Sequence, residues 1–196
     1  MKQRLFVGVP LPPATRHALG QWTAHLAACH AGWRWVRAEQ LHVTLRFLGD
    51  TDETIRPQLE SGLAELAAAA RRFVLPVAGW GVFPGPSRPR VLWAGVHDDD
   101  HRLGAMATSI ERLAQQLGFE PERRRFSGHV TLARAARGAR RAELPGTPKP
   151  EAPRFGELIV DRVVLFCSHL GLGGARYETL AAPELAAVTG ETGDSR

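Results

Sequence analysis

The 196-residue sequence predicts an α+β domain built mainly from antiparallel sheet. Strand-like runs and amphipathic helical segments alternate irregularly, and the last part of the chain is typical of strands joined by turns. This pattern argues against a doubly wound fold, and no glycine-rich phosphate loop of the Walker or dinucleotide type is present. With 44% hydrophobic and 23% charged residues, the chain can bury one sizeable core or two small lobes packed together.

The first half of the chain predicts three strands and two helices. Pro12 and Pro13 suit the first turn of a helix, where a missing N–H costs little. The turn pair Gly49-Asp50 closes a strand, and Asp52 provides an N-cap for the helix that follows. In order, the expected elements are a strand at 4–9, a helix that ends before Gly32, a short strand at 33–36, a strand at 41–48 and a helix after Asp52.

The second half predicts further strands around one amphipathic helix. Gly79 and Gly81 mark bulges or bends in an extended segment, and three successive aspartates give a helix N-terminus signal. In order, the expected elements are a strand at 73–83, a loop at 84–89, a strand at 91–96, a helix from 98–100 to Gly118, a strand at 129–133, a mobile loop at 137–153, strands at 158–166 and 176–180 paired around a turn at 171–174, and a tail from about 187.

Composition restricts the compartment and the partners. Cys29 and Cys167 do not form a disulfide framework in a chain of this length, and neither a signal peptide nor a membrane span is apparent, so we expect a cytoplasmic protein. No Cys/His spacing typical of a structural zinc site is present. The formal net charge of +5 favours anionic partners such as phosphates or nucleic acid.

The sharpest signal is a repeated tetrapeptide. His42-Val43-Thr44-Leu45 is identical to His129-Val130-Thr131-Leu132, and each copy lies in an expected strand. Two copies are expected by chance in roughly one chain in several hundred of this composition. Since a strand alternates its faces, each copy presents an imidazole and a hydroxyl on one side and two aliphatic side chains on the other. The repeat therefore predicts two His/Thr pairs across a common site.

Two His/Thr pairs suit phosphodiester chemistry. An unperturbed imidazole titrates near pH 6.5, so one ring can accept a proton from an attacking water while the other donates one to the leaving oxygen. Threonine hydroxyls can donate hydrogen bonds to the non-bridging oxygens, and no metal is then required. The alternative is that each histidine only caps a strand or satisfies a buried polar network.

The sequence resembles the 2H phosphoesterase superfamily. The segments that carry the resemblance are RWVRAEQLHVTLRFLGD at 34–50, RPRVLWAGV at 88–96, GFEPERRRFSGHVTLAR at 118–134 and DRVVLFCSHLGLGGARYETL at 161–180. They look like its bacterial and archaeal branch, the RNA 2′,3′-cyclic phosphodiesterases, also called 2′-5′ RNA ligases. The resemblance covers roughly residues 3–183.

The resemblance implies a fold and a reaction. The fold is bilobal, with two mostly antiparallel sheets, flanking helices and pseudo-two-fold symmetry around a central cleft. Residues 1–186 would form one phosphodiesterase domain with one motif in each lobe, and residues 187–196 a flexible tail. The reaction is cofactor-free and metal-free hydrolysis of a 2′,3′-cyclic phosphate to a 2′-phosphate, with RNA 3′ ends or cyclic nucleotides as substrates. We expect a monomer with no membrane partner.

The resemblance also implies roles for individual residues. His42 matches the proton donor to the leaving group, and His129 matches the base that activates water. Thr44 and Thr131 match the phosphate-binding threonines, and Arg134 matches a phosphate-contacting arginine. Strict alternation would place Arg134 opposite His129, so this role requires the strand to end or bulge near Ala133.

Other features have two interpretations each. Gly128 replaces the proline that usually precedes the second histidine, which loosens the approach to the strand. Arg88, Arg90 and Trp93 could bind phosphate and stack a base, although VLWAGV favours Trp93 in the core. Arg123–Arg125 could attract RNA or form a solvated surface run. The segment His97–His101 resembles a metal-binding cluster, but a helix cap is favoured.

Three other functions stay open at this point. The same residues could perform ligation of a 2′,3′-cyclic end to a 5′-hydroxyl through a 2′-5′ bond, although water at about 55 M favours hydrolysis. The chain could instead be a non-catalytic RNA-binding module, or an endoribonuclease that cuts internal linkages.

Overall fold

The structure is a computed structural model of the chain, and it describes residues 1–136, 144, 153–171 and 174–187. The α+β class is confirmed, with three α-helices and one nine-stranded sheet in this part of the chain. The elements are β1 (Lys2–Pro10), α1 (Pro13–Cys29), β2 (Trp33–Trp35), the 3-10 turn η1 (Ala38–Gln40), β3 (His42–Asp52), the 3-10 turn η2 (Glu53–Ile55), α2 (Arg56–Ala69), β4 (Phe73–Phe83), β5 (Val91–Val96), α3 (Arg102–Gln116), β6 (His129–Ala135), β7 (Arg154–Val160), β8 (Val164–Gly171) and β9 (Gly174–Ala181).

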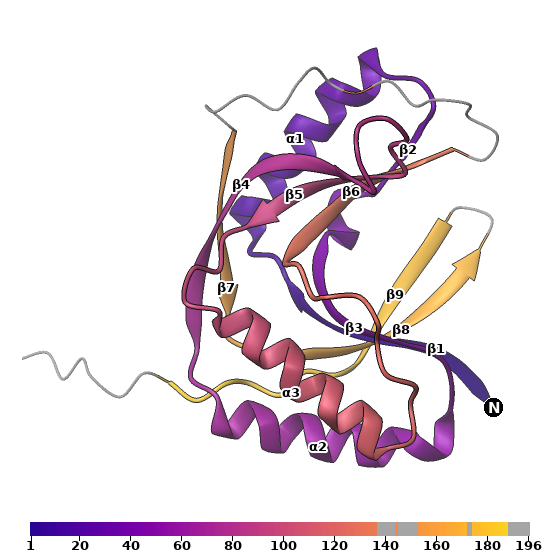
Figure 1. The fold of residues 1–196 in the computed structure, drawn as a ribbon, viewed down its shortest axis with the longest axis vertical. Helices are drawn as coiled ribbons and strands as arrows, with labels where there is room; N and C mark the ends of the chain where they lie inside the picture. The colour runs from indigo at the N-terminus through magenta and orange to yellow at the C-terminus, as the bar shows by residue number, and fades with distance from the viewer. Residues whose placement is uncertain (137–143, 145–152, 172–173, 188–196) are drawn as a thin grey trace, which may run out of the picture.

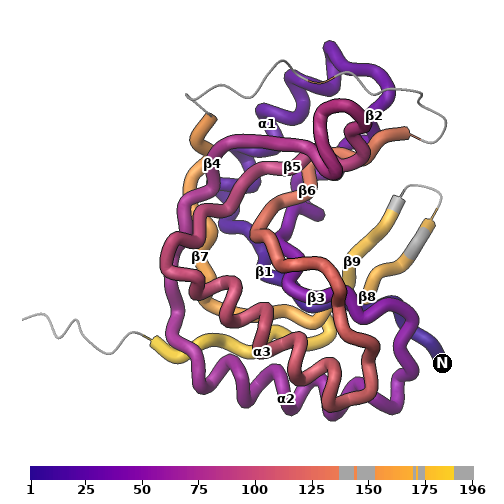
Figure 2. Tube along the Cα trace, in the orientation of Figure 1, coloured from indigo at the N-terminus to yellow at the C-terminus, as the bar shows by residue number. Residues whose placement is uncertain are grey.

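The strands form one continuous sheet rather than two. Their order is β7-β4-β5-β6-β3-β1-β8-β9, with β2 paired to the far part of β6, and every strand pair is antiparallel. The two halves meet where Val43 of β3 pairs with Val130 of β6. Figures 1 and 2 show the halves opening away from this meeting point on the side where the β8–β9 hairpin projects.

The helices cover the two halves of the sheet. Helix α1 packs against β7, and its Trp22 contacts Trp80 of β4 and Phe155 of β7. Helices α2 and α3 pack side by side at the other end of the molecule, where α3 contacts β3 (Figure 1). Helices α1 and α3 thus cover apolar faces of the sheet, and α2 packs on α3, which is an arrangement that buries both kinds of element.

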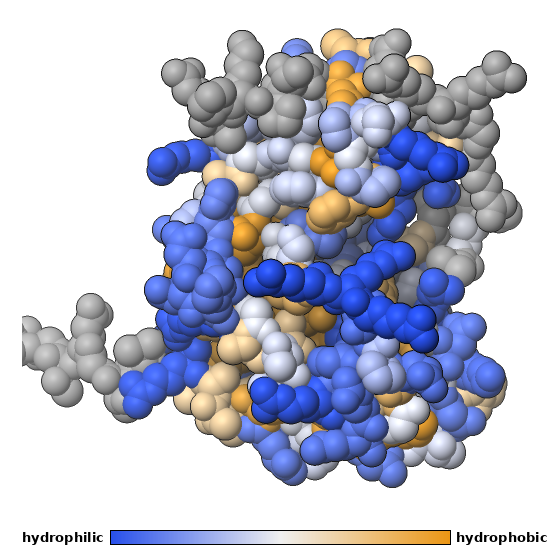
Figure 3. Space-filling model, viewed as in Figure 1, coloured by the Kyte–Doolittle hydropathy of each residue, from blue (hydrophilic) through white to orange (hydrophobic). Residues whose placement is uncertain are grey.

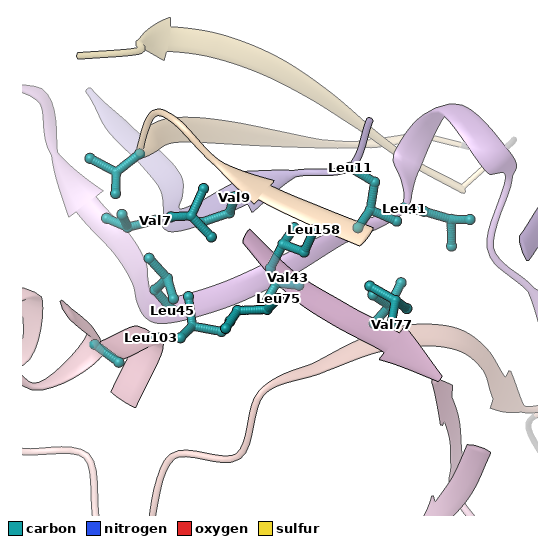
Figure 4. Close-up of a cluster of buried hydrophobic side chains, with 14 of the residues drawn as sticks. Val7, Val9, Leu11, Leu41, Val43, Leu45, Leu75, Val77, Leu103 and Leu158 are labelled. Carbon is teal, nitrogen blue, oxygen red and sulfur yellow. The ribbon is translucent and has the colours of Figure 1, made fainter. Parts of the chain in front are cut away.

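One hydrophobic core runs through both halves. Figure 4 shows Val7 and Val9 of β1 and Val43 of β3 beside Leu75 of β4 and Leu158 of β7, all of them buried. Full burial of each such side chain contributes roughly 1.5–3 kcal/mol relative to exposure. Because strands from both halves supply this core, its packed side chains support the pairing of β3 with β6 from the buried face of the sheet.

Three expected boundaries differ from the structure. The pair Gly49-Asp50 does not end a strand, since β3 continues to Asp52 and Gly49, at φ +72°, lies at an irregularity in its pairing with β1. Asp52 is a cap as expected, but its carboxylate accepts from the Thr54 N–H of η2 rather than capping α2. The single strand expected at 158–166 is the end of β7 and the start of β8, separated by a bend at Asp161.

Other expectations are confirmed. Helix α1 begins at Pro13, β4 spans Phe73–Phe83, and Gly79, at φ +69°, lies at a bulge between β4 and β5. The hairpin β8–β9 turns at the expected place. The loop expected at 137–153 and the tail expected at 187–196 lie almost entirely outside the described residues.

Candidate active site

The two copies of the tetrapeptide lie side by side in the middle of the sheet. With Val43 opposite Val130 in an antiparallel pair, His42 falls opposite Thr131 and Thr44 falls opposite His129. The aliphatic members Val43 and Val130 are fully buried on the core face, so the four polar side chains share the other face. The histidines thus occupy diagonal corners of a four-residue cluster, and the threonines occupy the other two.

Each imidazole is held by the same local hydrogen bond. His42 Nδ1 lies 2.7 Å from the carbonyl oxygen of Gln40, and His129 Nδ1 lies 2.7 Å from that of Ser127. A carbonyl only accepts, so Nδ1 carries the proton in both rings and Nε2 is the atom available for proton transfer. His42 Nε2 lies 3.1 Å from Thr44 Oγ1, which points this nitrogen along the shared face of β3.

Burial and charge make both rings harder to protonate. Desolvation is the main cause that lowers the pKa of His42; the hydrogen bond to Gln40 acts in the opposite direction, and the charges of Arg134 and His129 lower it further. Desolvation is also the main cause that lowers the pKa of His129, again with a contribution from Arg134. The charges of His129 and Arg134 both act on His42, and that of Arg134 also acts on His129, so the three groups lie in one electrostatic site. A bound phosphate would reverse these effects, because an anion favours the protonated ring.

The lowered pKa values predict the pH profile. For an acid–base pair, kcat/KM peaks between the two apparent pKa values of the free enzyme, because the acid must be protonated and the base deprotonated. Since both values lie below the ordinary 6.5 of histidine, we expect a bell-shaped profile with its maximum below pH 6.5. Saturating substrate raises both values, so the kcat profile should shift to higher pH. Initial rates over pH 4–9 test this, and a kcat/KM maximum above pH 7 contradicts it.

A bulge brings Arg134 onto the face of the histidines. In the pairing of β5 with β6, Leu92 lies opposite Ala133 but Trp93 lies opposite Thr131, so Leu132 is the extra residue. Leu132 and Ala133 are both buried, and the alternation resumes one residue late. Arg134 therefore projects on the same face as Thr131, and its charge influences both histidines. The bulge near Ala133, which the expected role of Arg134 requires, is therefore present.

Aromatic rings that the sequence did not single out enclose His42. Its ring centroid lies 4.8 Å from Phe6 of β1, 5.1 Å from Tyr177 of β9 and 5.9 Å from Phe166 of β8. Burial raises the pKa of the Tyr177 hydroxyl, and the charge of Arg134 counteracts this effect. These rings lie around His42, whose burial is the main cause of its lowered pKa. The one available signal was that Tyr177 is the only tyrosine of the chain.

Trp93 lies beside His129 on the surface of the sheet. Its sequence context favoured a position in the core instead. Trp93 is partly exposed, lies 6.4 Å from His129 between ring centroids and shares its face of the sheet. Phe83 of β4 lies 5.1 Å from His129 and edge-on to it. The indole covers Gly81, where an added Cβ would lie 2.3 Å from the ring. Glycine at position 81 therefore allows the Trp93 ring to lie against the backbone, rather than allowing a bend in the strand.

The remaining sequence features have structural roles. Asp98 caps α3, accepting from the backbone N–H of Leu103 and Gly104 at 3.2 and 2.9 Å, which confirms the cap. Gly128 is not among the described glycines with positive φ, so its backbone conformation does not require glycine.

Within the described ranges, no three His, Cys, Asp or Glu side chains are placed to share a metal ion, and no helix is long and apolar enough to cross a membrane.

Exposed arginines precede the second motif. Arg123, Arg124 and Arg125 lie on the segment between α3 and β6, and all three are exposed. Figure 3 shows strongly hydrophilic residues across the middle of the molecule, where this segment passes. A basic segment next to two histidines favours the approach of an anion.

Known proteins resemble this chain over most of its length. The model of the family described as LigT like phosphoesterase matches residues 9–93. An RNA 2′,3′-cyclic phosphodiesterase of Aeropyrum pernix is 40% identical over 149 residues, 74% of this chain and 82% of that protein. One of Geobacillus stearothermophilus is 30% identical over 98% of this chain, which spans 61% of that protein's length.

A solved structure agrees with these sequence relatives. Escherichia coli LigT complexed with 3′-AMP matches with a TM-score of 0.78 and 26% identity, over 95% of this chain and 99% of that one. The matching fold carries the paired His/Thr motif of this chain on adjacent central strands. The chain therefore belongs to the LigT-like phosphoesterases, the 2H family that contains the RNA 2′,3′-cyclic phosphodiesterases.

Proposed function

We propose that His42 and His129 are the general acid and base with which this RNA 2′,3′-cyclic phosphodiesterase, a hydrolase, opens the cyclic phosphate and leaves a 2′-phosphate. The observation that carries the proposal is the diagonal arrangement of the two imidazoles about a single pair of threonines. In-line displacement requires the attacking and leaving oxygens on opposite sides of phosphorus. Two rings at diagonal corners can reach these opposite sides.

The proton transfers follow from the free Nε2 atoms. His129 Nε2 accepts a proton from water as the water oxygen attacks phosphorus. His42 acts in its doubly protonated form, which a bound phosphate favours, and donates the proton on Nε2 to O3′ as the P–O3′ bond breaks, while the phosphate remains on O2′. The order of the two roles comes from the family resemblance. After product release, one proton passes through solvent from His129 to His42, so both rings return to their starting states.

The other polar groups bind the phosphate. Thr44 and Thr131 lie between the histidines and can donate hydrogen bonds to the non-bridging oxygens. Arg134 stays charged at any pH of interest and can offset the negative charge that develops in the transition state. The chemistry needs no group beyond these side chains and water, so we propose hydrolysis without a metal or cofactor.

The proposal includes the bilobal organisation of residues 1–186. The strand order supports it, because β3-β1-β8-β9 on one side of the meeting point is matched by β6-β5-β4-β7 on the other. The matching continues along the chain, since each unit has a strand, a helix and then a strand that begins with the His/Thr motif: β1, α1 and β3 in one, with β2 and η1 inserted before β3, and β5, α3 and β6 in the other. A pseudo-two-fold axis between β3 and β6 relates the two units, with the phosphate on this axis.

The test is hydrolysis of an oligoribonucleotide that ends in a 2′,3′-cyclic phosphate, in the presence of excess EDTA. We expect full activity in EDTA and a product whose phosphate is on O2′. A parallel preparation of the His129→Ala variant is the control for contaminating nucleases. Loss of activity in EDTA, a 3′-phosphate product or internal cleavage fragments contradict the proposal, and joined products with a 5′-hydroxyl RNA would indicate ligation instead.

A further inference from the structure

Two arginines lie directly opposite each other beside the active site. Arg34 of β2 pairs in register with Arg134 of β6. Residues directly opposite in an antiparallel pair project from the same face, so Arg34 shares the face of Arg134 and of the histidines. Its neighbour Trp33 is buried on the other face, as alternation requires.

This pair of like charges has no counter-charge among the described residues. None of the ion pairs found there includes Arg34 or Arg134, and both side chains are exposed. Like charges directly opposite each other on a sheet destabilise it. A bound anion would remove this cost, and guanidinium groups are suited to phosphate oxygens.

The two arginines lie at different depths in the site. The charge of Arg134 lowers the pKa of both His42 and His129, whereas the charge of Arg34 contributes to neither shift. Arg134 is therefore the inner cation, within reach of the phosphate that reacts, and Arg34 is the outer one. The outer position lies along β2, away from the meeting point of β3 and β6.

The chemistry of the substrate identifies the outer anion. A 2′,3′-cyclic phosphate ends an RNA chain, so the nearest other phosphate is the one on O5′ of the same nucleotide. We infer that Arg34 binds this 5′-phosphate and makes the enzyme select nucleotides that belong to an RNA chain over free nucleoside cyclic phosphates. The inference rests on the proposed function, since it assumes that the reacting phosphate lies between the histidines.

The test compares two substrates that differ by one group. Nucleoside 2′,3′-cyclic phosphate is supplied with either a 5′-hydroxyl or a 5′-phosphate, and kcat/KM is measured for each. We expect the wild-type protein to prefer the 5′-phosphorylated substrate by about fivefold to tenfold, a factor appropriate to a charged contact at an exposed site. This preference should decrease as salt is added.

The Arg34→Ala variant should lose the preference and keep the reaction. We expect its ratio of the two kcat/KM values to fall to about one, with less than a twofold change for the 5′-hydroxyl substrate. Arg34→Lys should retain part of the preference. The matched control is Arg112→Ala, which removes the same charge from an exposed position on α3 and should keep the wild-type ratio. The melting temperature of Arg34→Ala should not decrease, because the repulsion with Arg134 is relieved.

Two results overturn the inference: a wild-type protein without the preference, or an Arg34→Ala variant that retains it or loses activity equally on both substrates. Failure of the proposed function is a separate result, in which the wild-type protein hydrolyses neither substrate. Equilibrium binding then decides the inference without turnover. A nucleoside 2′,5′-bisphosphate should bind the wild-type protein more tightly than a nucleoside 2′-phosphate, and Arg34→Ala should remove this difference.

Discussion

Replacement of His42 or of His129 by alanine is expected to lower kcat for 2′,3′-cyclic phosphate hydrolysis by about 10²–10⁴-fold, the usual contribution of a positioned acid or base. Each ring is held through Nδ1 by a carbonyl oxygen two residues earlier, which leaves Nε2 for proton transfer, and alanine removes this atom. The double variant should be little worse than either single one, because the two groups act in one step. Steady-state rates on a cyclic-phosphate oligoribonucleotide measure this.

A matched control and a second substrate make the test specific. His169 is exposed on β8, and its Nε2 lies 2.8 Å from Oε2 of Glu178. Because its partner is this carboxylate, His169→Ala should keep wild-type activity. A phosphodiester with a p-nitrophenolate leaving group needs no acid, so it should restore part of the rate to His42→Ala and none to His129→Ala. The reverse pattern would exchange the two roles, and wild-type rates in both variants would remove the histidines from the mechanism.

Gly8→Ala is expected to reduce stability and activity together. Gly8 of β1 lies opposite Thr44, and a Cβ at this position would lie 2.6 Å from the carbonyl oxygen of Val43 and 3.5 Å from His42 Cδ2. A backbone oxygen cannot rotate away, so β1 and β3 must separate. Strain of this kind costs about 1–3 kcal/mol. Since Val43 also pairs with Val130, the shift should misplace His42, and we expect kcat to fall by about tenfold.

Thermal unfolding and rate measurements on the same samples test this second prediction. The melting temperature should fall by about 3–10 °C for a domain of this size. The control is Gly104→Ala in α3, where the nearest atom to the added Cβ is Asp98 Oδ2 at 3.7 Å. Alanine should stabilise this helix by about 0.4–1 kcal/mol without any change in rate. A Gly8→Ala protein with the wild-type melting temperature would show that the strands adapt without cost.

The active-site strands could be predicted because their information is local. An His-x-Thr pattern needs only the two-residue period of a strand to place both polar groups on one face, and the aliphatic Val43 and Val130 anchor the other face. The position of Arg134 could be stated only as a condition. A bulge depends on how β5 pairs with β6, and no residue within β6 marks Leu132 as the extra one.

Long-range pairing explains what the sequence did not predict. Phe6 reaches His42 because β1 pairs with β3, and Tyr177 reaches it because β9 pairs with β8, which pairs with β1 and so joins the two ends of the chain. No local periodicity reports such neighbours. The single sheet, in place of the two implied by the family resemblance, depends in the same way on the pairing of Val43 with Val130.

The placement of the helices means that the chain cannot be reduced to a smaller catalytic unit. Helix α1 lies in the connection from β1 to β3, which also contains β2, yet it covers β7 in the opposite half; α3 connects β5 to β6 yet covers β3. The helix that covers each half therefore lies in a connection between strands of the other half. Separated halves would expose their apolar surfaces, and each would retain only one of the two imidazoles. Both folding and catalysis therefore require the intact polypeptide or the reassembly of its two halves.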